Sequence, residues 1–274
     1  MIIGIDLGGS TTDAVLWGTN PHVVTVEAND PIAAAAGALG KLTEEIGVGL
    51  GSIEAVAATG GGSRRLGERI LGIPVHKVPE IVAIGIGGAT LAERERALVV
   101  SLGTGTALVS VERGDVQHVG GTGVGGGTLL GLARHLVQIS RLDTLERLAA
   151  AGDLAHVDLT VGDIAGGPVG RLPAHATASN FGKLGADARP EDKARGLVNM
   201  IAEVIVSLSV LAARACSQQD IVLTGKLLRV RPFMERVRAT TGLFDVQFLV
   251  PPYAEYATAI GAARHLATSA GEAR

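Results

Sequence analysis

Hydrophobic residues gather in short runs at the start of the chain, and turn-forming residues separate the runs. Apolar segments lie at 2–5, 12–17 and 22–26, with Gly, Ser, Asn and Pro between them. Short apolar runs bounded in this way predict β-strands joined by turns. The spacing becomes helical over Pro31–Ile46 and extended again over Ile53–Ala58. The beginning of the chain therefore predicts a hairpin, a third strand, a helix and a fourth strand.

After the fourth strand comes the glycine-rich turn TGGGS, which ends at Ser63. A serine ahead of a periodic segment favours helix capping, so we expect Ser63 to cap a short helix over 64–71. An extended segment is expected at 73–78 and a further helix from near Glu80.

The same succession begins again near residue 97. ALVVSLG (97–103) and TALVSVERG (106–114) predict a hairpin, and VQHVGG (116–121) predicts its third strand. Two halves with one order of elements predict a duplicated α/β unit whose two lobes, 1–93 and 94–274, enclose a ligand cleft. The later elements are expected as helices at 128–139 and 143–151, a long helix at 190–217, a strand at 221–224, a helix, a strand at 246–250 and a last helix from about Glu255.

One segment of the second half has no regular pattern. Residues 152–189 are rich in Gly, Pro and polar residues and are too long for an ordinary connection, so we expect a functional flap. The apolar helix that follows contains Glu203 and Arg214, which favours a buried or interface helix over a membrane span.

Composition and charge narrow the functional classes. The formal net charge of −3 does not favour a nucleic-acid partner, and the basic segment from Lys226 is interpreted as a solvated helix face. The single cysteine, Cys216, leaves no intramolecular disulfide and disfavours a Cys-based metal site. The N-terminus lacks the basic region of a signal peptide, so a cytoplasmic protein is expected.

The turn of the first predicted hairpin carries groups suited to phosphate. Glycine lets backbone N–H groups approach an anion closely, and hydroxyl groups add donors. Asp6, at the end of the strand before the turn, could hold Mg²⁺, which keeps most of its water shell. The expected phosphate donors of this turn are Gly8, Gly9, Ser10, Thr11 and Thr12.

The second predicted hairpin has a matching turn, with Gly103, Thr104, Gly105 and Thr106. Each turn alone could be an ordinary glycine-rich hairpin turn. Two such turns, each opening one half of a duplicated unit, instead predict two phosphate loops that clamp a nucleoside triphosphate across the cleft.

A third glycine cluster begins at Gly120. Residues 121–126 fit G-x-G-x-x-G, and Asp143 lies about twenty residues further on, as in a dinucleotide-binding fold. A lone match is weak in a chain with 39 glycines, and Asp143 falls at the start of a predicted helix. The favoured interpretation is a turn whose following helix points its N-terminus at phosphate or nucleotide.

Together these residues resemble the type II pantothenate kinases, which belong to the superfamily of actin, sugar kinases and heat-shock chaperone ATPases. The resemblance covers nearly the whole chain and implies a duplicated actin-like, ribonuclease H-like ATPase fold. The matching motifs, in order, are GIDLGGS at Gly4, PEIVAIG at Pro79, LGTGTAL at Leu102, HVGGTGVGGGTLLGL at His118, ATASNFG at Ala176, IVLTGKL at Ile221 and YATAIGAA at Tyr256.

The resemblance implies ATP-dependent phosphorylation of the primary hydroxyl of pantothenate, the first committed step of coenzyme A synthesis. Glu80 takes the place of the family's general base, and Asp6 would organise Mg²⁺. It also implies a homodimer formed through the helix at 190–217. The expected nucleotide contacts include Gly103, Thr104, Gly105, Gly125, Gly126, Gly127 and Gly225, and the expected substrate contacts are Thr106, His118, Gly120 and Gly121.

This sequence departs from the family pattern at two positions. The family commonly has a lysine where this chain has Asp13, so Asp13 either faces away from the triphosphate or alters metal handling. The family has an arginine where this chain has His118, which offers one donor at a time instead of a bidentate fork. The substrate carboxylate would then be held weakly, be held by another residue such as Arg113, or be absent from a related small alcohol.

Two other classes share the phosphate loops. Activators and reactivating factors of radical or corrinoid enzymes have a similar opening motif, but electron-transferring activators bind an iron–sulfur cluster through cysteines, and this chain has one. A nucleotide-binding regulator without catalysis is the other alternative, supported by Asp13 and His118 alone.

Overall fold

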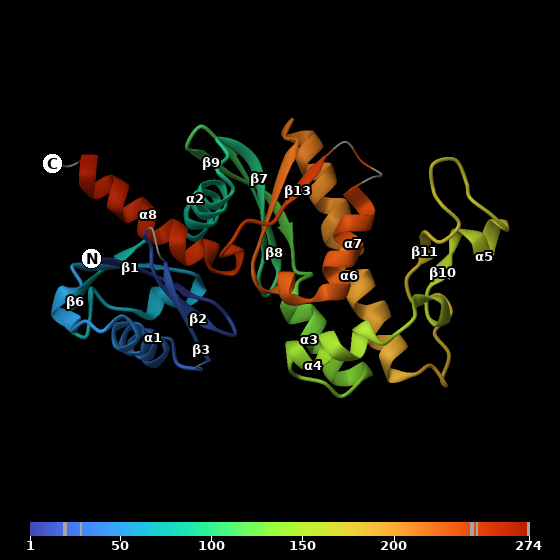
Figure 1. Ribbon diagram of the computed structural model, residues 1–274, viewed down its shortest axis with the longest axis horizontal. Helices are drawn as coiled ribbons and strands as arrows, with labels where there is room; N and C mark the ends of the chain where they lie inside the picture. Colours follow the sequence, from blue (N-terminus) through green and yellow to red (C-terminus); the bar gives the residue numbers. More distant parts are fainter. Residues whose placement is uncertain (19–20, 28, 242–243, 245, 273–274) are drawn as a thin grey trace.

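The computed structural model describes residues 1–18, 21–27, 29–241, 244 and 246–272. Two mixed β-sheets stand side by side in Figure 1, with helices on their outer faces and two further helices between them. Most strands and helices lie close to where the hydrophobic pattern predicts them.

The first sheet has the strand order β3-β2-β1-β4-β6-β5. Strands β1, β2 and β3 form an antiparallel meander, whereas β4 and β6 run parallel to β1. Every residue of β4 is buried, as expected for a strand covered on both faces. The strands are β1 (Ile2–Leu7), β2 (Thr12–Leu16), β3 (His22–Val26), β4 (Ala55–Thr59), β5 (Arg69–Ile70) and β6 (Ile73–Lys77).

The second sheet repeats this topology in the order β9-β8-β7-β12-β13. Its first three strands again form an antiparallel meander, and β12 and β13 run parallel to β7. The predicted duplication is therefore confirmed. The strands are β7 (Arg96–Leu102), β8 (Thr106–Glu112), β9 (Asp115–Thr122), β12 (Asp220–Thr224) and β13 (Gln247–Leu249).

Helices complete the two lobes. In the first lobe, α1 (Pro31–Ile46) starts with Pro31 after an Asp30 cap and buries its alanine- and leucine-rich face on the first sheet. In the second lobe, the core lies between the second sheet and its outer helices, and Phe233 is its largest fully buried side chain. These helices are α3 (Gly126–Leu136), α4 (Leu142–Ala150), α6 (Pro190–Ala215) and α7 (Arg231–Thr241).

Two crossing helices join the lobes. Helix α2 (Glu80–Ala92) follows the first sheet in sequence but packs on the second, and α8 (Ala257–Glu272) ends the chain but packs on the first. Glycines permit their close contact, because a Cβ atom on Gly87 would lie 1.8 Å from the carbonyl oxygen of Ala257. The division of the chain into lobes 1–93 and 94–274 stays a prediction. Helix α8 does not follow it, because α8 comes from the second part of the sequence but packs on the first sheet.

Helix α6 is long and apolar enough to cross a membrane by length and composition alone, and 61% of its most apolar window is buried inside the protein. Helices that fill the core of a folded protein have the same properties. Its buried face packs in the core of the second lobe, which agrees with the prediction of a buried or interface helix.

The flap at residues 152–189 contains short elements and projects away from the body of the second lobe (Figure 1). Asp158 ties it to α6, because its carboxylate accepts the backbone N–H of Phe181 and the side-chain amide of Asn199, each at 2.8 Å. The elements are η3 (Leu154–His156), β10 (Leu159–Thr160), α5 (Val161–Ala165) and β11 (Thr177–Ser179).

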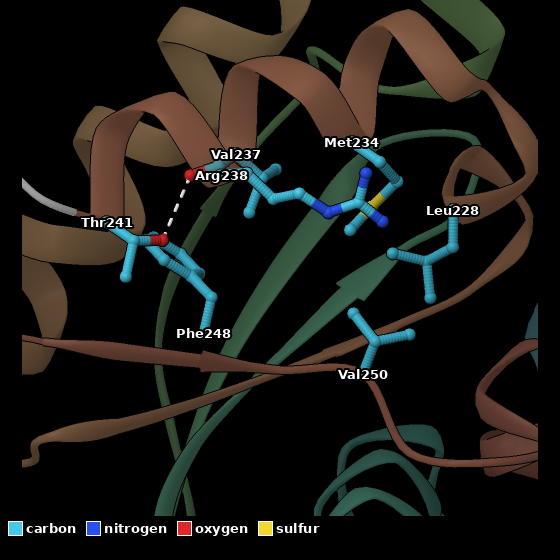
Figure 2. Close-up of a pocket in the computed structure, with 7 residues that line it drawn as sticks. All are labelled: Leu228, Met234, Val237, Arg238, Thr241, Phe248 and Val250. Carbon is cyan, nitrogen blue, oxygen red and sulfur yellow. Dashed lines mark hydrogen bonds between the residues drawn. The ribbon is translucent and has the colours of Figure 1, made fainter.

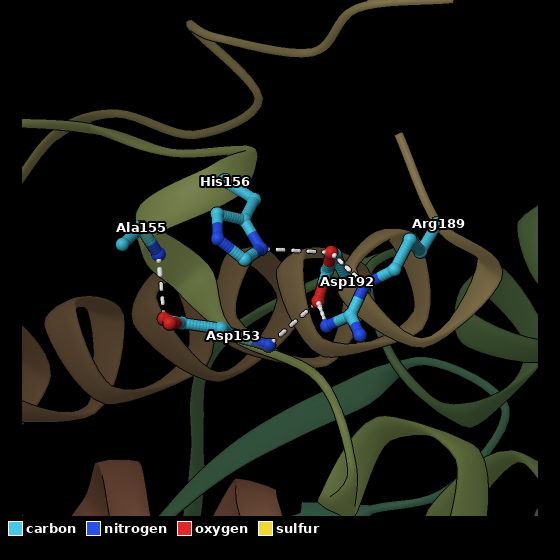
Figure 3. A network of polar contacts seen from close by, with 5 residues as sticks. All are labelled: Asp153, Ala155, His156, Arg189 and Asp192. Atoms are coloured by element: carbon cyan, nitrogen blue, oxygen red, sulfur yellow. Dashed lines mark hydrogen bonds and ion pairs between the residues drawn. The ribbon is translucent and has the colours of Figure 1, made fainter. Parts of the chain in front are cut away.

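Both ends of the flap meet at the carboxylate of Asp192, in the first turn of α6 (Figure 3). On the entry side, the backbone N–H of Asp153 donates to Oδ1 at 2.8 Å, and Nδ1 of His156 lies 2.9 Å from Oδ2. On the exit side, Arg189 donates to both oxygens. These hydrogen bonds, that of Arg189 above all, hold the pKa of Asp192 well below its usual range.

One predicted helix is wrong. Residues 61–65 form the 3₁₀ turn η2, and the segment predicted as helical ends in the hairpin strand β5. Ser63 does not cap a helix, because its hydroxyl donates to the carbonyl of Gly60 at 2.7 Å. Leu71 and Gly72 both have positive φ, the conformation of a tight hairpin turn, so the chain reverses into β6.

Candidate active site

The first predicted phosphate loop is the turn between β1 and β2. The N–H of Gly8 donates to the carbonyl of Thr11 at 3.0 Å, so this amide closes the turn. Gly9 and Ser10 are exposed, whereas Thr12 is buried in β2. Of the predicted donors, Gly9 and Ser10 therefore present the most open groups at the tip of the turn.

The second predicted loop is the turn between β7 and β8, and it faces the first. A Cβ atom on Gly9 would lie only 3.1 Å from Oγ1 of Thr104, so the two turns nearly touch. The hydroxyl of Thr106 is buried and donates to the carbonyl of Val124 at 2.8 Å, which holds the segment before α3. Thr106 thus contacts the main chain of its own lobe.

The third glycine cluster packs on the second turn. The N–H groups of Gly126 and Gly127 donate to the carbonyls of Gly103 and Thr104, each at 2.9 Å. A Cβ atom on Gly125 would lie 2.7 Å from the backbone of Gly105. These glycines are therefore required for the close approach of α3 to the turn, whatever further contact they make with a nucleotide.

The dinucleotide-binding interpretation of this cluster does not fit the fold. The cluster follows β9, an antiparallel edge strand, and not a parallel strand of a βαβ unit. Asp143 is exposed in the first turn of α4 and pairs with Arg141 at 3.2 Å.

Equivalent glycines end the central parallel strands of both sheets. Gly225 follows Thr224 of β12 with φ of 101°, and a Cβ atom there would lie 2.4 Å from the carbonyl oxygen of Leu102. Gly60 follows Thr59 of β4 with φ of 81°, and its Cβ atom would lie 2.4 Å from Oδ1 of Asp6. Sequence reasoning proposed Gly225 and missed Gly60, although a Thr-Gly pair after a strand occurs in both halves.

Acidic residues gather beside the first turn. Asp6 and Asp13 are paired across β1 and β2, and Glu80 stands at the start of α2. Burial raises the pKa of Asp6 to about 7, and the charges of Asp13 and Glu80 act in the same direction. A cation would stabilise the ionised form of a buried carboxylate whose pKa is raised in this way.

The residues present fit a magnesium ion of the kind that kinases use. No group of three or more His, Cys, Asp or Glu side chains suited to a metal occurs among the described residues. Mg²⁺ at a phosphate site needs fewer protein ligands, because one or two carboxylates, water and phosphate oxygens complete its shell. Asp6 could therefore supply such a carboxylate.

Sequence reasoning missed Lys226 as a site residue. The interpretation as a solvated helix face holds for α7, where Arg231 and Arg238 are exposed, but not for Lys226, which opens the 3₁₀ turn η4 (Lys226–Arg229) and reaches the first lobe. Its Nζ donates to Oδ1 of Asp13 at 2.9 Å and to the hydroxyl of Thr11. Thr25 also donates to Oδ1 of Asp13, at 2.5 Å. Asp13 therefore neither faces solvent nor stands unpaired beside the turn.

Three of the four predicted substrate contacts lie along β9, and the fourth, Thr106, begins β8. His118 is exposed and pairs with Val109, while Gly120 and Gly121 lie nearer the second turn. Alternation along the strand puts His118 on the face of Val116, which packs against Gly85 of α2. Arg113 lies at the opposite end of β8 from Thr106, roughly 20 Å from the second turn, so its proposed role in holding a carboxylate does not fit.

A hollow outside this cluster lies between η4, α7 and β13 (Figure 2). Arg238 and Thr241 line it with five apolar side chains, and no predicted site residue takes part. The lining residues are Leu228, Met234, Val237, Arg238, Thr241, Phe248 and Val250.

Comparisons with known proteins agree with the fold and identify the family. The Fumble family model matches residues 94–263, more than half of the chain. A type II pantothenate kinase from Oceanobacillus iheyensis is 35% identical over 65% of this chain and 69% of its own length. Another, from Staphylococcus aureus, is 29% identical over 86% of this chain and 88% of its own length.

Solved structures share the architecture. Component A of the (R)-2-hydroxyglutaryl-CoA dehydratase of Acidaminococcus fermentans aligns with a TM-score of 0.72, covering 98% of both chains at 17% identity. A ROK family glucokinase from Streptomyces griseus, in complex with glucose and AMPPNP, aligns with a TM-score of 0.60 over 96% of this chain and 98% of its own, at 14% identity. At these identities the likeness concerns the fold.

The duplicated sheets, the crossing helices and the paired turns define an actin-like ATPase fold, and the curated relatives place the chain in the class of ATP-dependent small-molecule kinases. Within that class, the chain belongs to the Fumble family, the family of the type II pantothenate kinases.

Proposed function

We propose that this chain is a pantothenate kinase, which transfers the γ-phosphoryl group of ATP to the primary hydroxyl of pantothenate and so begins coenzyme A synthesis. The observation that carries the proposal is the pair of turns, Gly8–Thr11 and Gly103–Gly105, that meet beside the acidic residues. Family membership supplies the reaction class, and the 35% identical relative carries the name pantothenate kinase.

Glu80 is the proposed general base. Its carboxylate is exposed at the first turn of α2, and its charge raises the pKa of the nearby Asp6. It would accept the hydroxyl proton as the substrate oxygen bonds to the γ-phosphorus and the bond to ADP breaks. Magnesium would neutralise the phosphate charge, and Asp6 would hold it through water.

Each lobe would supply part of the nucleotide site. From the first turn, Gly9 and Ser10 present an exposed backbone, and from the second, Thr104 presents its hydroxyl. The glycines at 125–127 and Gly225 would act by letting the main chain approach the nucleotide closely.

A second candidate function rests on His118. An exposed histidine is a weaker carboxylate ligand than arginine, and Arg113 stands at the far end of the sheet. A related primary alcohol without the carboxylate is therefore the alternative substrate.

We propose that two copies associate through α6, in keeping with the expected homodimer. Leu211 is 61% exposed, and Val204 and Leu208 on the same side of the helix are partly exposed. Residues at this spacing form one face of a helix, and an apolar face suits a partner helix. A cytoplasmic location and the absence of nucleic-acid and membrane partners stay expectations.

The test is coupled ADP release with Mg-ATP and three acceptors: pantothenate, pantetheine and a pantothenate analogue without the carboxylate. Turnover of pantothenate that falls about 10³-fold in Glu80→Gln would support the proposal, since general-base catalysis contributes up to about 10⁴-fold. Turnover of the carboxylate-free alcohols alone would favour the second candidate. No acceptor-dependent ADP release would contradict both.

A further inference from the structure

Lys226 belongs to the second lobe, but its ammonium group lies against residues of the first lobe. It is the first residue of η4, separated from β12 by Gly225, and its ammonium contacts Thr11 and Asp13 of the first hairpin. The side chain of Lys226 is 24% exposed and that of Asp13 is 8% exposed. The ion pair is therefore largely shielded from water and spans the two lobes.

The backbone before Lys226 fixes this direction. Gly225 has a φ of 101° and lies against the backbone of Leu102, at the start of the second turn. Its N–H donates to the carbonyl of Ala254 at 3.0 Å, so the start of η4 is held on two sides. The lysine consequently emerges where the first and second turns approach each other.

The same position lies beside the acidic residues. The positive charge of Lys226 lowers the pKa of Asp6, against the larger effects of burial and of the neighbouring acids. An ammonium group in this position can bind an anion that enters between the two turns. The phosphates of a nucleotide carry several charges and offer more oxygens than one carboxylate, so they compete well for it.

Asp13 would keep one hydrogen bond if this partner moved to another anion. The hydroxyl of Thr25 already donates to the same oxygen at 2.5 Å and would remain. Lysine is a flexible point charge whose ammonium can turn from one acceptor to another without a fixed fork geometry. The pair therefore has the properties of an exchangeable contact.

We infer that Lys226 is a phosphate-binding residue of the nucleotide site, and that Asp13 holds it between the lobes until phosphate oxygens replace the carboxylate. This inference rests on the proposed function, because it needs a nucleotide between the turns. It assigns Asp13 a competing role, so the two members of one ion pair should affect nucleotide binding in opposite directions.

The test measures the Kd of Mg-AMPPNP for the full chain by titration calorimetry, without an acceptor. Lys226→Gln should raise the Kd at least roughly tenfold, the effect of one charge-assisted hydrogen bond. Asp13→Asn should lower the Kd several-fold, because the lysine is then free of its competitor. Lys226→Arg should restore part of the affinity, since it keeps the charge.

Asp220→Asn is the matched control. It removes a carboxylate from an ion pair of similar length, 2.6 Å to Arg94, at the opposite end of β12 from Lys226, and should leave the Kd unchanged. Weaker nucleotide binding in both Lys226→Gln and Asp13→Asn would overturn the inference, because a purely structural pair loses the same contact from either side.

The outcome is separable from that of the proposed function. Wild-type protein that binds Mg-AMPPNP but transfers no phosphoryl group to pantothenate would reject the pantothenate kinase proposal alone. Opposite shifts in the Kd of the two variants would support the role of Lys226 in either case.

Discussion

The two lobes have one topology but distribute their chemistry differently. In each lobe a strand leads into a glycine-containing turn, and a parallel neighbour ends in Thr-Gly followed by a 3₁₀ turn. The strand register makes Asp6 the counterpart of Ser101, because each pairs with the Thr of that Thr-Gly, Thr59 or Thr224. The first lobe thus places a carboxylate where the second places a hydroxyl.

The same contrast extends to the neighbouring strand. Across the hairpin, Asp6 pairs with Asp13, whereas Ser101 pairs with Ala107. The residue after the Thr-Gly is Gly61 in the first lobe and Lys226 in the second. The first lobe therefore concentrates negative charge, and the second offers close-packed glycine backbone and the one lysine that crosses to Asp13. In the proposed function, the carboxylates for a metal ion would therefore come from the first lobe alone, whereas both lobes would supply turns to the nucleotide site.

The largest expected effect on the rate comes from substituting the two counterpart residues, Asp6 and Ser101, one at a time. Asp6→Asn should reduce phosphoryl transfer about 10³-fold, because it removes the carboxylate proposed to organise the cation. Ser101→Ala, at the equivalent position of the second lobe, should change the rate less than about fivefold. Steady-state ADP release compares them, and equal losses would mean that the lobes share the metal-binding role.

The same substitution, Asp6→Asn, should raise the stability of the folded protein although it lowers the rate. The pKa of Asp6 is 3.8 in the reference state and about 7 in the folded chain. Between these values the folded protein holds a proton that the unfolded chain has lost, so this group's contribution to stability falls as the pH rises towards 7. The free energy of unfolding of Asp6→Asn should therefore exceed that of the wild type by about 2 to 4 kcal/mol above pH 7, and by almost nothing near pH 4.

Urea unfolding of the wild type and of Asp6→Asn at pH 4 and pH 8 measures this difference. Ser101→Ala is again the control and should show no such pH dependence. A gain that does not grow with pH would mean that burial does not oppose the ionisation of Asp6.

The glycines that end β4 and β12 should show the next largest effect. Ala at Gly60 or at Gly225 combines positive φ with a Cβ contact of 2.4 Å, and each substitution should cost about 2 to 4 kcal/mol of unfolding free energy. Their functional effects should differ, because a Cβ atom on Gly60 would meet the carboxylate of Asp6 as well as the backbone of Leu7, whereas one on Gly225 would meet only the backbone of Leu102.

Gly60→Ala should therefore weaken Mg²⁺ dependence as well as stability, and Gly225→Ala should act chiefly on stability and nucleotide binding. Chemical unfolding and the Mg²⁺ concentration for half-maximal ADP release separate the two effects. Identical changes in both quantities would contradict the distinction between the lobes.

Sequence patterns predicted most of this architecture because its strands and helices have strong hydrophobic periodicity. Helix α1 runs over Pro31–Ile46 as predicted, with a proline at its first turn and a left-handed Gly47 at its end. The helix predicted over 64–71 was wrong, because the positive φ of Leu71 is set by the hairpin into β6 and not by its own preference. A local sequence pattern does not show a backbone conformation that the pairing of β5 with β6 imposes.

The site was predicted less completely than the fold. Glycine-rich turns have a local signature, so the two turns proposed as phosphate loops could be located from the sequence. Lys226 lies more than two hundred residues from Asp13, and no local pattern reports a contact between them. Its neighbours at helical spacing instead favoured a solvated helix face, and only the crossing of the two lobes reveals its place.

The smallest effect concerns the paired threonines. The hydroxyl of Thr224 donates to the carbonyl of Val100 at 3.3 Å, whereas the hydroxyl of Thr59 is buried and has no hydrogen-bond partner among the residues that the structure describes. An unpaired buried hydroxyl costs about 1 to 3 kcal/mol, so Thr59→Val should leave the unfolding free energy unchanged or raise it by up to about 1 kcal/mol. Thr224→Val should lower it by about 1 kcal/mol, since it removes a hydrogen bond. Urea unfolding of both variants at pH 8 decides between them: if Thr59→Val is as destabilising as Thr224→Val, the two hydroxyls are equivalent and the lobes do not differ at this position.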